Sequence, residues 1–232
     1  MDRSELKYSL EKLQEEMSEA ALRSGRSMRD ITLVAVSKTH SADMVAELFG
    51  CGQRAFGENY VQEAQAKMEN LSHLDIDWHF IGRIQSNKAR QVAGRFSLIQ
   101  SVHSLKLARR LDNIVRESNS VQPVLVQVNV GGEEQKSGVM SAQAEEVCTG
   151  IEEMPGLDLQ GLMVLPPFFE DGEESRPYFA RLRELKEKME KKLGRNLPHL
   201  SMGMTADFPQ AIEEGATLIR VGTRLFGARE YK

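Results

Sequence analysis

The chain has 232 residues, of which 41% are hydrophobic and 28% charged, ordinary proportions for a globular protein with a buried core. Thirty lysines and arginines against thirty-four aspartates and glutamates give a formal net charge of −4, which argues against a nucleic-acid-binding protein. Apolar runs fall short of the ~20 residues that span a bilayer. The polar start lacks a signal segment, and Cys51 and Cys148 stand far apart, so we expect a cytoplasmic protein with free thiols.

The first segment, residues 4–24, has the pattern of an amphipathic helix. Its apolar residues recur at spacings of four and three and are Leu6, Leu10, Leu13, Met17 and Ala20. We expect this helix to pack against the body of the fold rather than to bind a membrane or form a coiled coil, because its heptad pattern soon stops.

Beyond Gly25, eight short apolar runs read as strands buried on both faces. They span residues 31–36, 54–57, 78–82, 97–102, 124–130, 159–165, 199–202 and 218–222. Helical patterns fill the gaps between them, at residues 42–50, 60–71, 87–93, 105–117, 142–153, 175–193 and 206–214.

This strict alternation predicts parallel strands joined by helical crossovers. Eight such strands favour a closed (β/α)8 TIM barrel with an extra N-terminal helix, and the length is near the ~250 residues typical of that fold. No stretch of linker composition divides the chain, so residues 1–232 are expected to form a single domain.

A lysine follows the first predicted strand, in Val36-Ser37-Lys38-Thr39. Functional groups of such barrels gather at the carboxyl ends of the strands, so the amine of Lys38 is expected at the barrel mouth. Partial burial there lowers the pKa of the amine and makes it a nucleophile that can form a Schiff base with a carbonyl. The alternative is a strand-end lysine that extends its amine into water.

The second and third predicted strands contribute two more polar residues. Asn59 follows Gly57 at the end of the second strand, where it is either the N-cap of the next helix or a contact to a ligand. His79 lies within the third strand and is expected to face inward in a structural role. No partner stands at metal-ligand spacing from it, so no metal site is predicted.

The last two strands end in Ser201-Met202-Gly203-Met204-Thr205 and in Arg220-Val221-Gly222-Thr223. Barrel enzymes frequently build a phosphate site from these two loops. The groups available for one are the hydroxyls of Ser201, Thr205 and Thr223 and the backbone amides near Gly203 and Gly222. A tight turn explains each glycine alone. Together with Lys38, however, they suggest pyridoxal 5′-phosphate, which carries both an aldehyde and a phosphate.

Eight motifs between residues 35 and 229 carry a family resemblance. They are Ala35-Val36-Ser37-Lys38-Thr39, Phe56-Gly57-Glu58-Asn59-Tyr60-Val61-Gln62-Glu63, Trp78-His79-Phe80-Ile81-Gly82, Gln85-Ser86-Asn87-Lys88, Lys136-Ser137-Gly138, Gly161-Leu162-Met163, Ser201-Met202-Gly203-Met204-Thr205, and Arg220-Val221-Gly222-Thr223 through Phe226-Gly227-Ala228-Arg229. With these motifs in this order, the chain resembles the YggS/PROSC family, the pyridoxal phosphate homeostasis proteins. No single motif is specific, but the set is.

The resemblance implies the barrel of the alanine racemase N-terminal domain and pyridoxal 5′-phosphate held as an aldimine of Lys38. It implies that Asn59 lies near the ring and that Arg220 faces the pyridine nitrogen. It places Ser201, Gly203, Thr205, Gly222 and Thr223 around the phosphate. Thr205 stands where many members have serine, which keeps the hydroxyl.

The favoured hypothesis is a non-catalytic protein of intracellular pyridoxal phosphate homeostasis. Since the guanidinium of Arg220 stays protonated, it leaves the ring a weak electron sink. The alternative is an amino-acid racemase, because racemases of the related fold also use an arginine here. They take a second acid/base from a C-terminal β domain, and we expect none here because the sequence ends at Lys232.

A third reading is an aldolase acting on a phosphorylated sugar. Such an enzyme would want a carboxylate beside Lys38, and none is evident from the neighbouring strand ends. Under the favoured hypothesis the expected partners are pyridoxal phosphate and the apo-enzymes that receive it. Nucleic acid and membrane are not expected partners, and the protein is expected to be a monomer.

Overall fold

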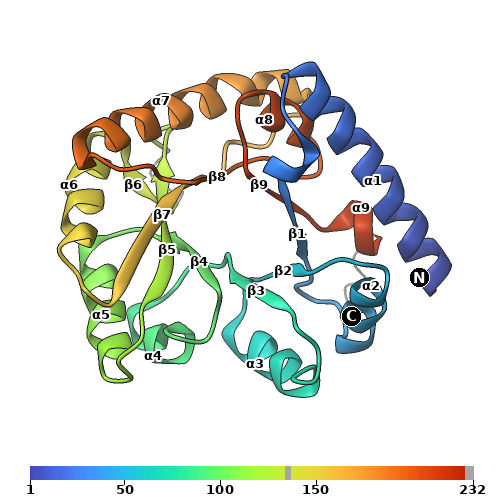
Figure 1. Ribbon diagram of the computed structural model, residues 1–232, viewed down its shortest axis with the longest axis horizontal. Helices are drawn as coiled ribbons and strands as arrows, with labels where there is room; N and C mark the ends of the chain where they lie inside the picture. The colour runs from blue at the N-terminus through green and yellow to red at the C-terminus, as the bar shows by residue number, and fades with distance from the viewer. Residues whose placement is uncertain (134–136, 228–232) are drawn as a thin grey trace.

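The computed structural model describes residues 1–133 and 137–227, and it contains one parallel sheet closed into a barrel (Figure 1). Eight strands form the barrel: β1 (Thr32–Val36), β2 (Ala55–Glu58), β3 (Asp77–Phe80), β4 (Leu98–Val102), β5 (Gln122–Asn129), β7 (Leu157–Val164), β8 (His199–Ser201) and β9 (Leu218–Val221). β1 pairs with both β2 and β9, and a β4–β5 pairing completes the ring. The predicted (β/α)8 barrel is therefore confirmed.

Helices surround the strands in Figure 1. They are α1 (Arg3–Arg23), α2 (Ala42–Gly50), α3 (Val61–Asn70), α4 (Ala89–Val92), α5 (Leu105–Arg116), α6 (Ser141–Glu152), α7 (Arg176–Leu193), α8 (Phe208–Glu213) and α9 (Thr223–Phe226). Short 3₁₀ turns occupy Met28–Asp30, Ser86–Lys88 and Gly172–Ser175. Among the described residues, no helix combines the length and the apolar composition needed to cross a membrane.

Four elements differ from the sequence expectation. The helix predicted over residues 87–93 begins as a 3₁₀ turn, and the one predicted from residue 206 begins only at Phe208. The two-residue strand β6 (Val139–Met140) and the helix α9 were not predicted. Both are too short to show a period in the sequence.

Side-chain caps explain where several helices begin. Asp2 and Glu5 form a capping box at the start of α1. Ser41 accepts a hydrogen bond from the amide of Met44 at the start of α2, and Ser104 accepts one from the amide of Leu107 at the start of α5. These polar residues directly precede the apolar periods and determine the residue at which each helix begins.

The N-terminal helix lies along the outside of the barrel, as expected. Its apolar stripe, Leu6, Leu10, Leu13, Met17, Ala20 and Ala21, is buried. The helix contacts α2, α8 and α9 and runs beside the β1 side of the barrel in Figure 1. It covers an apolar part of the helical ring that water would otherwise reach.

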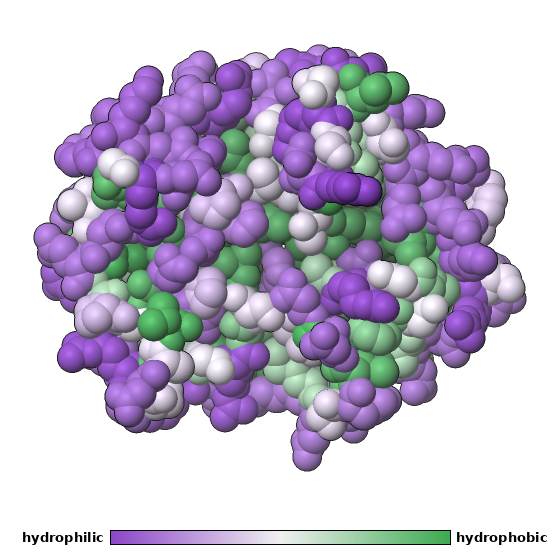
Figure 2. All heavy atoms as spheres, viewed as in Figure 1, coloured by the Kyte–Doolittle hydropathy of each residue, from purple (hydrophilic) through white to green (hydrophobic). Residues whose placement is uncertain are grey.

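Two apolar regions hold the fold together. The larger lies mainly between the sheet and the helices, and a smaller cluster comprises Val34, Ala55, Leu98, Leu125, Met163 and Leu218. Figure 2 shows hydrophilic side chains over the outer helices and hydrophobic ones toward the middle of this face. Buried polar residues such as Gln100, Ser201 and Arg220 also lie on barrel strands. This polar interior supports the site described next.

Candidate functional site

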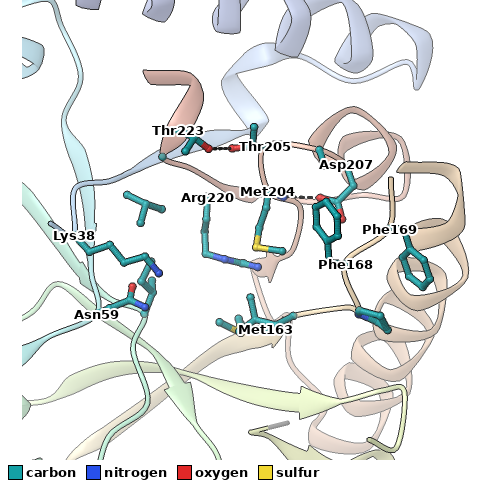
Figure 3. Close-up of a pocket in the computed structure, with 16 residues that line it drawn as sticks. Lys38, Asn59, Met163, Phe168, Phe169, Met204, Thr205, Asp207, Arg220 and Thr223 are labelled. Carbon is teal, nitrogen blue, oxygen red and sulfur yellow. Dashed lines mark hydrogen bonds between the residues drawn. The ribbon is translucent and has the colours of Figure 1, made fainter. Parts of the chain in front are cut away.

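A cavity of about 520 Å³ opens at the carboxyl ends of the barrel strands (Figure 3). It is lined by Val36, Lys38, Asn59, Ile81, Met163, Leu165, Pro167, Phe168, Phe169, Met204, Thr205, Ala206, Asp207, Arg220, Gly222 and Thr223. Ends of several different strands contribute, as expected for this type of barrel. Six of the eight predicted cofactor-binding residues line the cavity, and Ser201 and Gly203 do not.

Lys38 lies in a tight turn that directly follows β1. The amide of His40 donates a hydrogen bond to the carbonyl oxygen of Ser37 at 3.1 Å, which closes the turn around Lys38 and Thr39. Thr39 has a φ of 69°, a left-handed conformation that a β-branched residue adopts only under constraint. The half-buried Lys38 side chain extends into the cavity toward Asn59 (Figure 3).

Asn59 follows the last residue of β2 and lines the cavity. The alternative that Asn59 caps the next helix is wrong, because the N-cap of α3 is Tyr60. The side-chain oxygen of Asn59 is buried and has no hydrogen-bond partner among the described residues. A polar ligand in the cavity would satisfy it.

Arg220 extends from β9 and is only 3% exposed. Its guanidinium donates hydrogen bonds to the carbonyl oxygen of Val164 at 2.9 Å and to the hydroxyl of Ser201. Burial lowers the pKa of Arg220 to about 10, while the carboxylate of Asp207 acts in the opposite direction. The side chain therefore remains a cation at neutral pH and can only donate hydrogen bonds.

Ser201 lies beneath Arg220 and belongs to a buried chain of hydrogen bonds. Its hydroxyl donates to the side-chain oxygen of Gln100 at 2.6 Å. The nitrogen of the Gln100 amide lies 2.7 Å from Nδ1 of His79, whose Nε2 lies 3.1 Å from the Asp77 carboxylate. With Nδ1 accepting and Nε2 donating, each group donates to the next, from the cationic Arg220 to the carboxylate of Asp77. The predicted structural role of His79 is confirmed by its burial and these two contacts.

The hydroxyls of Thr205 and Thr223 meet at the rim of the cavity, 3.3 Å apart, as the dashed line in Figure 3 marks. Gly222 lines the cavity beside them. Gly203 has a different role, because its φ is +91° and a Cβ there would lie 2.6 Å from that of Ala211. It lets the turn after β8 pack closely on α8.

The apolar wall of the cavity was missed by the sequence analysis. It comprises Ile81, Met163, Leu165, Pro167, Phe168, Phe169 and Met204. Phe168 is 79% exposed at the opening, in the loop after β7. Two adjacent phenylalanines in a predicted loop were the available signal, because loops seldom expose such residues without a function.

The titratable groups that line the cavity within residues 1–133 and 137–227 are Lys38, Asp207 and Arg220. Asp207 was also missed, and both of its carboxylate oxygens accept hydrogen bonds, from the amide of Met204 at 2.7 Å and from the hydroxyl of Ser175 at 2.8 Å. The motif residues Lys136, Ala228 and Arg229 lie outside the described residues.

One carboxylate lies at a strand end next to the Lys38 turn, although it does not line the cavity in which an acid/base would act. Glu58 is the last residue of β2 and accepts a hydrogen bond from the hydroxyl of Ser37. It is fully buried and is absent from the cavity lining. The sequence read Glu58 only as part of a motif, because strand ends alone do not tell which side chains reach the mouth.

Comparisons with known proteins agree with this geometry. The family model of the alanine racemase N-terminal domain matches residues 9–230, which assigns this barrel to that class of domains. The chain is 44% identical over 222 residues to a pyridoxal phosphate homeostasis protein of Aquifex aeolicus, covering 96% of this chain and 97% of the relative. The chain thus belongs to the family of pyridoxal phosphate homeostasis proteins, as the motifs predicted.

Two solved structures extend the comparison. PipY of Synechococcus elongatus, solved with pyridoxal phosphate bound, has a TM-score of 0.81 and 39% identity, covering 91% of this chain and 99% of PipY. An alanine racemase of Clostridium difficile has a TM-score of 0.79 and 15% identity, covering 99% of this chain and 58% of the racemase. The second likeness shows a shared fold alone.

Proposed function

We propose that this protein binds pyridoxal 5′-phosphate in the cavity through Lys38 and takes part in intracellular pyridoxal phosphate homeostasis. The observation that carries the proposal is the convergence of an amine, a buried cation and a pair of hydroxyls on one cavity. Family membership supports it, because relatives covering nearly the whole chain are named for pyridoxal phosphate homeostasis.

The residues present fit this cofactor. The cavity volume, about 520 Å³, lies within the ~300–1,000 Å³ range of small-molecule sites. The oxygen of Asn59, which has no partner within the described part of the chain, can accept a hydrogen bond from a polar ring substituent. The apolar wall that includes Met163 and Phe169 suits the face of an aromatic ring.

The roles follow from the places of these residues. Bound pyridoxal phosphate supplies an aldehyde that reacts reversibly with amines. Lys38 would hold the cofactor covalently, Asn59 would lie beside the ring, and Arg220 would donate toward the ring nitrogen. Thr205, Gly222 and Thr223 would hold the phosphate. Ser201 and Gly203 stay predictions as cofactor residues, and their contacts favour support of Arg220 and of the turn.

We also propose that the protein has no substantial catalytic activity. Arg220 is a donor without negative charge, so it does not favour a protonated ring nitrogen as a carboxylate would. Asp207 already accepts two hydrogen bonds, so it is poorly placed to move a proton. Holding the cofactor and releasing it to apo-enzymes is the function this chemistry supports best.

Reduction with borohydride tests the covalent attachment. The purified protein is loaded with pyridoxal phosphate, reduced and digested, and the labelled peptide is identified by mass spectrometry. We expect the label on Lys38 and none in Lys38→Met. A label on another lysine of the parent protein would refute the assignment.

Proton exchange tests the absence of catalysis. The loaded protein is incubated with L- and D-alanine in deuterated water, and α-proton exchange and optical rotation are followed. We expect exchange far below the ~1 s⁻¹ of an ordinary enzyme, with transfer of cofactor to an apo-enzyme still measurable. Exchange at an enzymatic rate would contradict this proposal and favour the alternative hypothesis of an amino-acid racemase.

The phosphate site has its own test. Thr205→Val and Thr223→Val keep the side-chain shape but remove the hydroxyl. Each should weaken binding of pyridoxal phosphate by about 1.5–3 kcal/mol, the usual contribution of a hydrogen bond to a charged group. Binding of pyridoxal, which lacks the phosphate, should change little. Equal losses for both ligands would contradict the assignment.

Three further features of the proposal concern the protein as a whole. We propose a single domain, a monomer and a place in the cytoplasm. The free Cys51 and the buried Cys148 suit a reducing compartment. The exposed large apolar residues come from separate parts of the chain, among them Tyr8, Leu22, Tyr60, Val121 and Phe168. Sedimentation equilibrium would test the monomer.

A further inference from the structure

Behind the turn that carries Lys38 lies a second lysine, whose amine is buried. Lys67 is on α3 and is only 4% exposed. Its amine donates three hydrogen bonds: to the carbonyl oxygen of Ser37 at 2.6 Å, to Oε1 of Glu58 at 2.7 Å and to Oε1 of Glu63 at 2.6 Å. An ammonium has three protons, so these contacts use its full capacity to donate.

The two carboxylates of this Lys67 cluster reach the same turn. The hydroxyl of Ser37 donates to Oε1 of Glu58 at 2.6 Å. The backbone amide of Thr39 donates to Oε1 of Glu63 at 2.6 Å. The cluster therefore contacts both peptide groups that flank Lys38, the carbonyl group before it and the amide group after it.

The turn needs such support. Thr39 has a φ of 69°, which is unfavourable for a β-branched residue and persists only where surrounding contacts impose it. The Glu63–Thr39 hydrogen bond acts on this residue directly, and Lys67 holds Glu63 in place. The contacts of the cluster thus converge on the backbone that orients the Lys38 side chain.

Stability alone does not account for the cluster. A buried ion pair is often no more stabilising than apolar side chains of the same volume. Here Glu58 is fully buried, and burial raises its pKa although Lys67 acts in the opposite direction. The cost of placing these charges inside the protein is explained if they fix the Lys38 turn.

We propose that Lys67, held by Glu58 and Glu63, is a positioning residue that fixes the turn of Lys38 and so directs the Lys38 amine to the aldehyde of the cofactor. This inference rests on the proposed function. Lys67 does not line the cavity and need not touch the cofactor. It acts through the two peptide groups beside Lys38.

The test compares two ligands. Pyridoxal phosphate can form a bond with an amine, whereas 4′-deoxypyridoxine 5′-phosphate has the same ring and phosphate but no aldehyde. Lys67→Met should weaken binding of pyridoxal phosphate at least about tenfold, a change of ~1.4 kcal/mol, and leave binding of the analogue within about threefold. Titration calorimetry of the full chain measures both.

Two more variants protect the test against misfolding. Lys67→Met with Glu58→Gln removes the cation and the buried anion together, so the core stays neutral. Glu63→Ala removes only the acceptor of the Thr39 amide, and Glu63 is 26% exposed, so the fold should tolerate it. Gln62→Ala, at an exposed position of the same helix, is the matched control and should change neither affinity.

The outcomes separate this inference from the proposed function. If the parent protein binds neither ligand, the proposed function fails. If the parent binds pyridoxal phosphate on Lys38 and the folded variants retain its affinity, the positioning role is refuted. An equal loss for both ligands also refutes it, because a general loosening of the site would not distinguish the aldehyde.

Discussion

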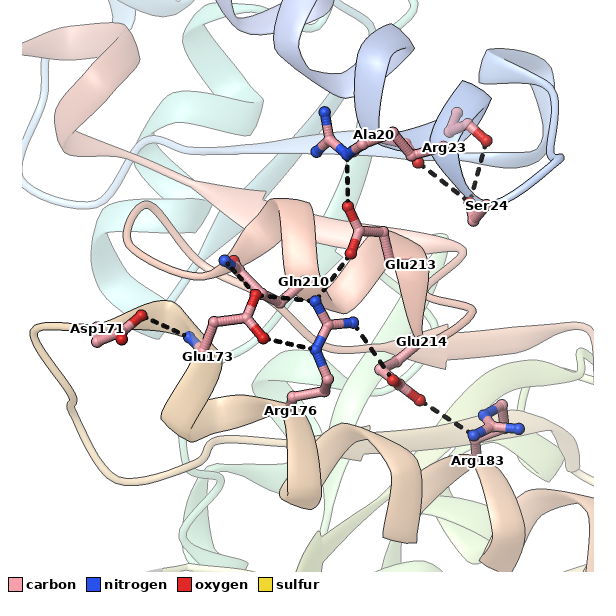
Figure 4. Close-up of polar contacts among 11 residues, drawn as sticks. Ala20, Arg23, Ser24, Asp171, Glu173, Arg176, Arg183, Gln210, Glu213 and Glu214 are labelled. Carbon is pink, nitrogen blue, oxygen red and sulfur yellow. Dashed lines mark hydrogen bonds and ion pairs between the residues drawn. The ribbon is translucent and has the colours of Figure 1, made fainter.

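Two clusters of ion pairs in this protein differ in how deeply their side chains are buried. The Lys67 cluster lies behind the Lys38 turn, and the side chains of Lys67 and Glu58 are almost completely buried. The second, the Arg176 cluster, joins outer helices at the surface, and its members are partly exposed (Figure 4). Both are built from basic side chains and glutamates.

The Arg176 cluster links elements that are distant in sequence. Arg176 contacts Glu173 at 2.8 Å, Glu213 at 2.8 Å and Glu214 at 3.4 Å. Arg23 of α1 contacts Glu213 at 2.7 Å, and Arg183 of α7 contacts Glu214 at 3.0 Å. These contacts bring α1, α7 and α8 together on the outside of the barrel.

The difference in depth decides what each cluster can do. Around Arg176, water and salt replace any lost partner, so each contact contributes little and positions little. Between Lys67 and the fully buried Glu58, solvent hardly replaces a lost partner, and a removed charge leaves the other uncompensated. The buried cluster therefore keeps a fixed geometry, which suits a positioning role. The exposed cluster only modestly stabilises the packing of the helices that it joins.

The largest effect should come from breaking the buried cluster. Lys67→Met leaves Glu58 buried without its cation, and we expect the free energy of unfolding to fall by about 3–5 kcal/mol. Urea denaturation of the apo-protein measures it, and adding Glu58→Gln should restore part of the loss. Glu69→Gln, at an exposed position of α3, is the control. A loss below ~1 kcal/mol would mean that the two clusters do not differ.

A neutral side chain inside a buried network, Gln100, separates the effect of burial from that of charge. Gln100→Leu removes the link between Ser201 and His79 while keeping a similar volume. We expect a loss of about 1–3 kcal/mol, the cost of buried polar groups left unpaired, and hence less than for Lys67→Met. Leu98→Met, a volume-conserving change on the same strand, is the control. An equal or larger loss than for Lys67→Met would show that burial alone matters.

Much of the fold was predictable because its pattern is local. The barrel strands are buried on both faces and read as apolar runs, and the helices between them show their period. The start of α8 was predicted two residues early, at Ala206, although Asp207 is the N-cap and the helix begins at Phe208. β6 was missed because two residues carry no pattern.

The residues of the site were predictable only where they closely follow the end of a barrel strand. Lys38, Asn59 and Thr223 line the cavity because each follows a barrel strand closely. Lys67 gave no such signal, since a lysine within a polar helix reads as a solvated residue. Only the packing of α3 against the Lys38 turn buries its amine. Ser201, conversely, stands at the expected position but lies beneath Arg220.

At the surface, Arg176→Gln should have a smaller effect than either buried change. Glu173, Glu213 and Glu214 all become hydrated, so the free energy of unfolding should fall by up to ~1 kcal/mol. This loss should shrink in 1 M salt, where the Debye length is about 3 Å. Arg181→Gln, at an exposed position of the same helix, is the control. A loss that is insensitive to salt would contradict the comparison.

The smallest expected effect concerns how stability depends on pH. The contributions of Glu58 and Glu173 to the free energy of unfolding should change with pH in opposite directions. Burial raises the pKa of Glu58 above its usual 4.5, so its contribution to stability is present below pH 4.5 and is lost as pH rises through the raised pKa. Hydrogen bonds from Arg176 lower the pKa of Glu173 from 4.5 to about 2. The contribution of Glu173 is therefore present above pH 4.5 and is lost as pH falls toward 2.

These signs are measured by subtracting the unfolding free energies of Glu58→Gln and of Glu173→Gln from that of the parent across pH. The difference for Glu58 should decrease with rising pH, and the difference for Glu173 should increase. Salt at 1 M should flatten the curve of this difference against pH for Glu173 and leave the curve for Glu58 unchanged. The reason is that salt screens exposed charges but not buried ones. Two curves of the same slope would mean that depth does not set the behaviour of these carboxylates.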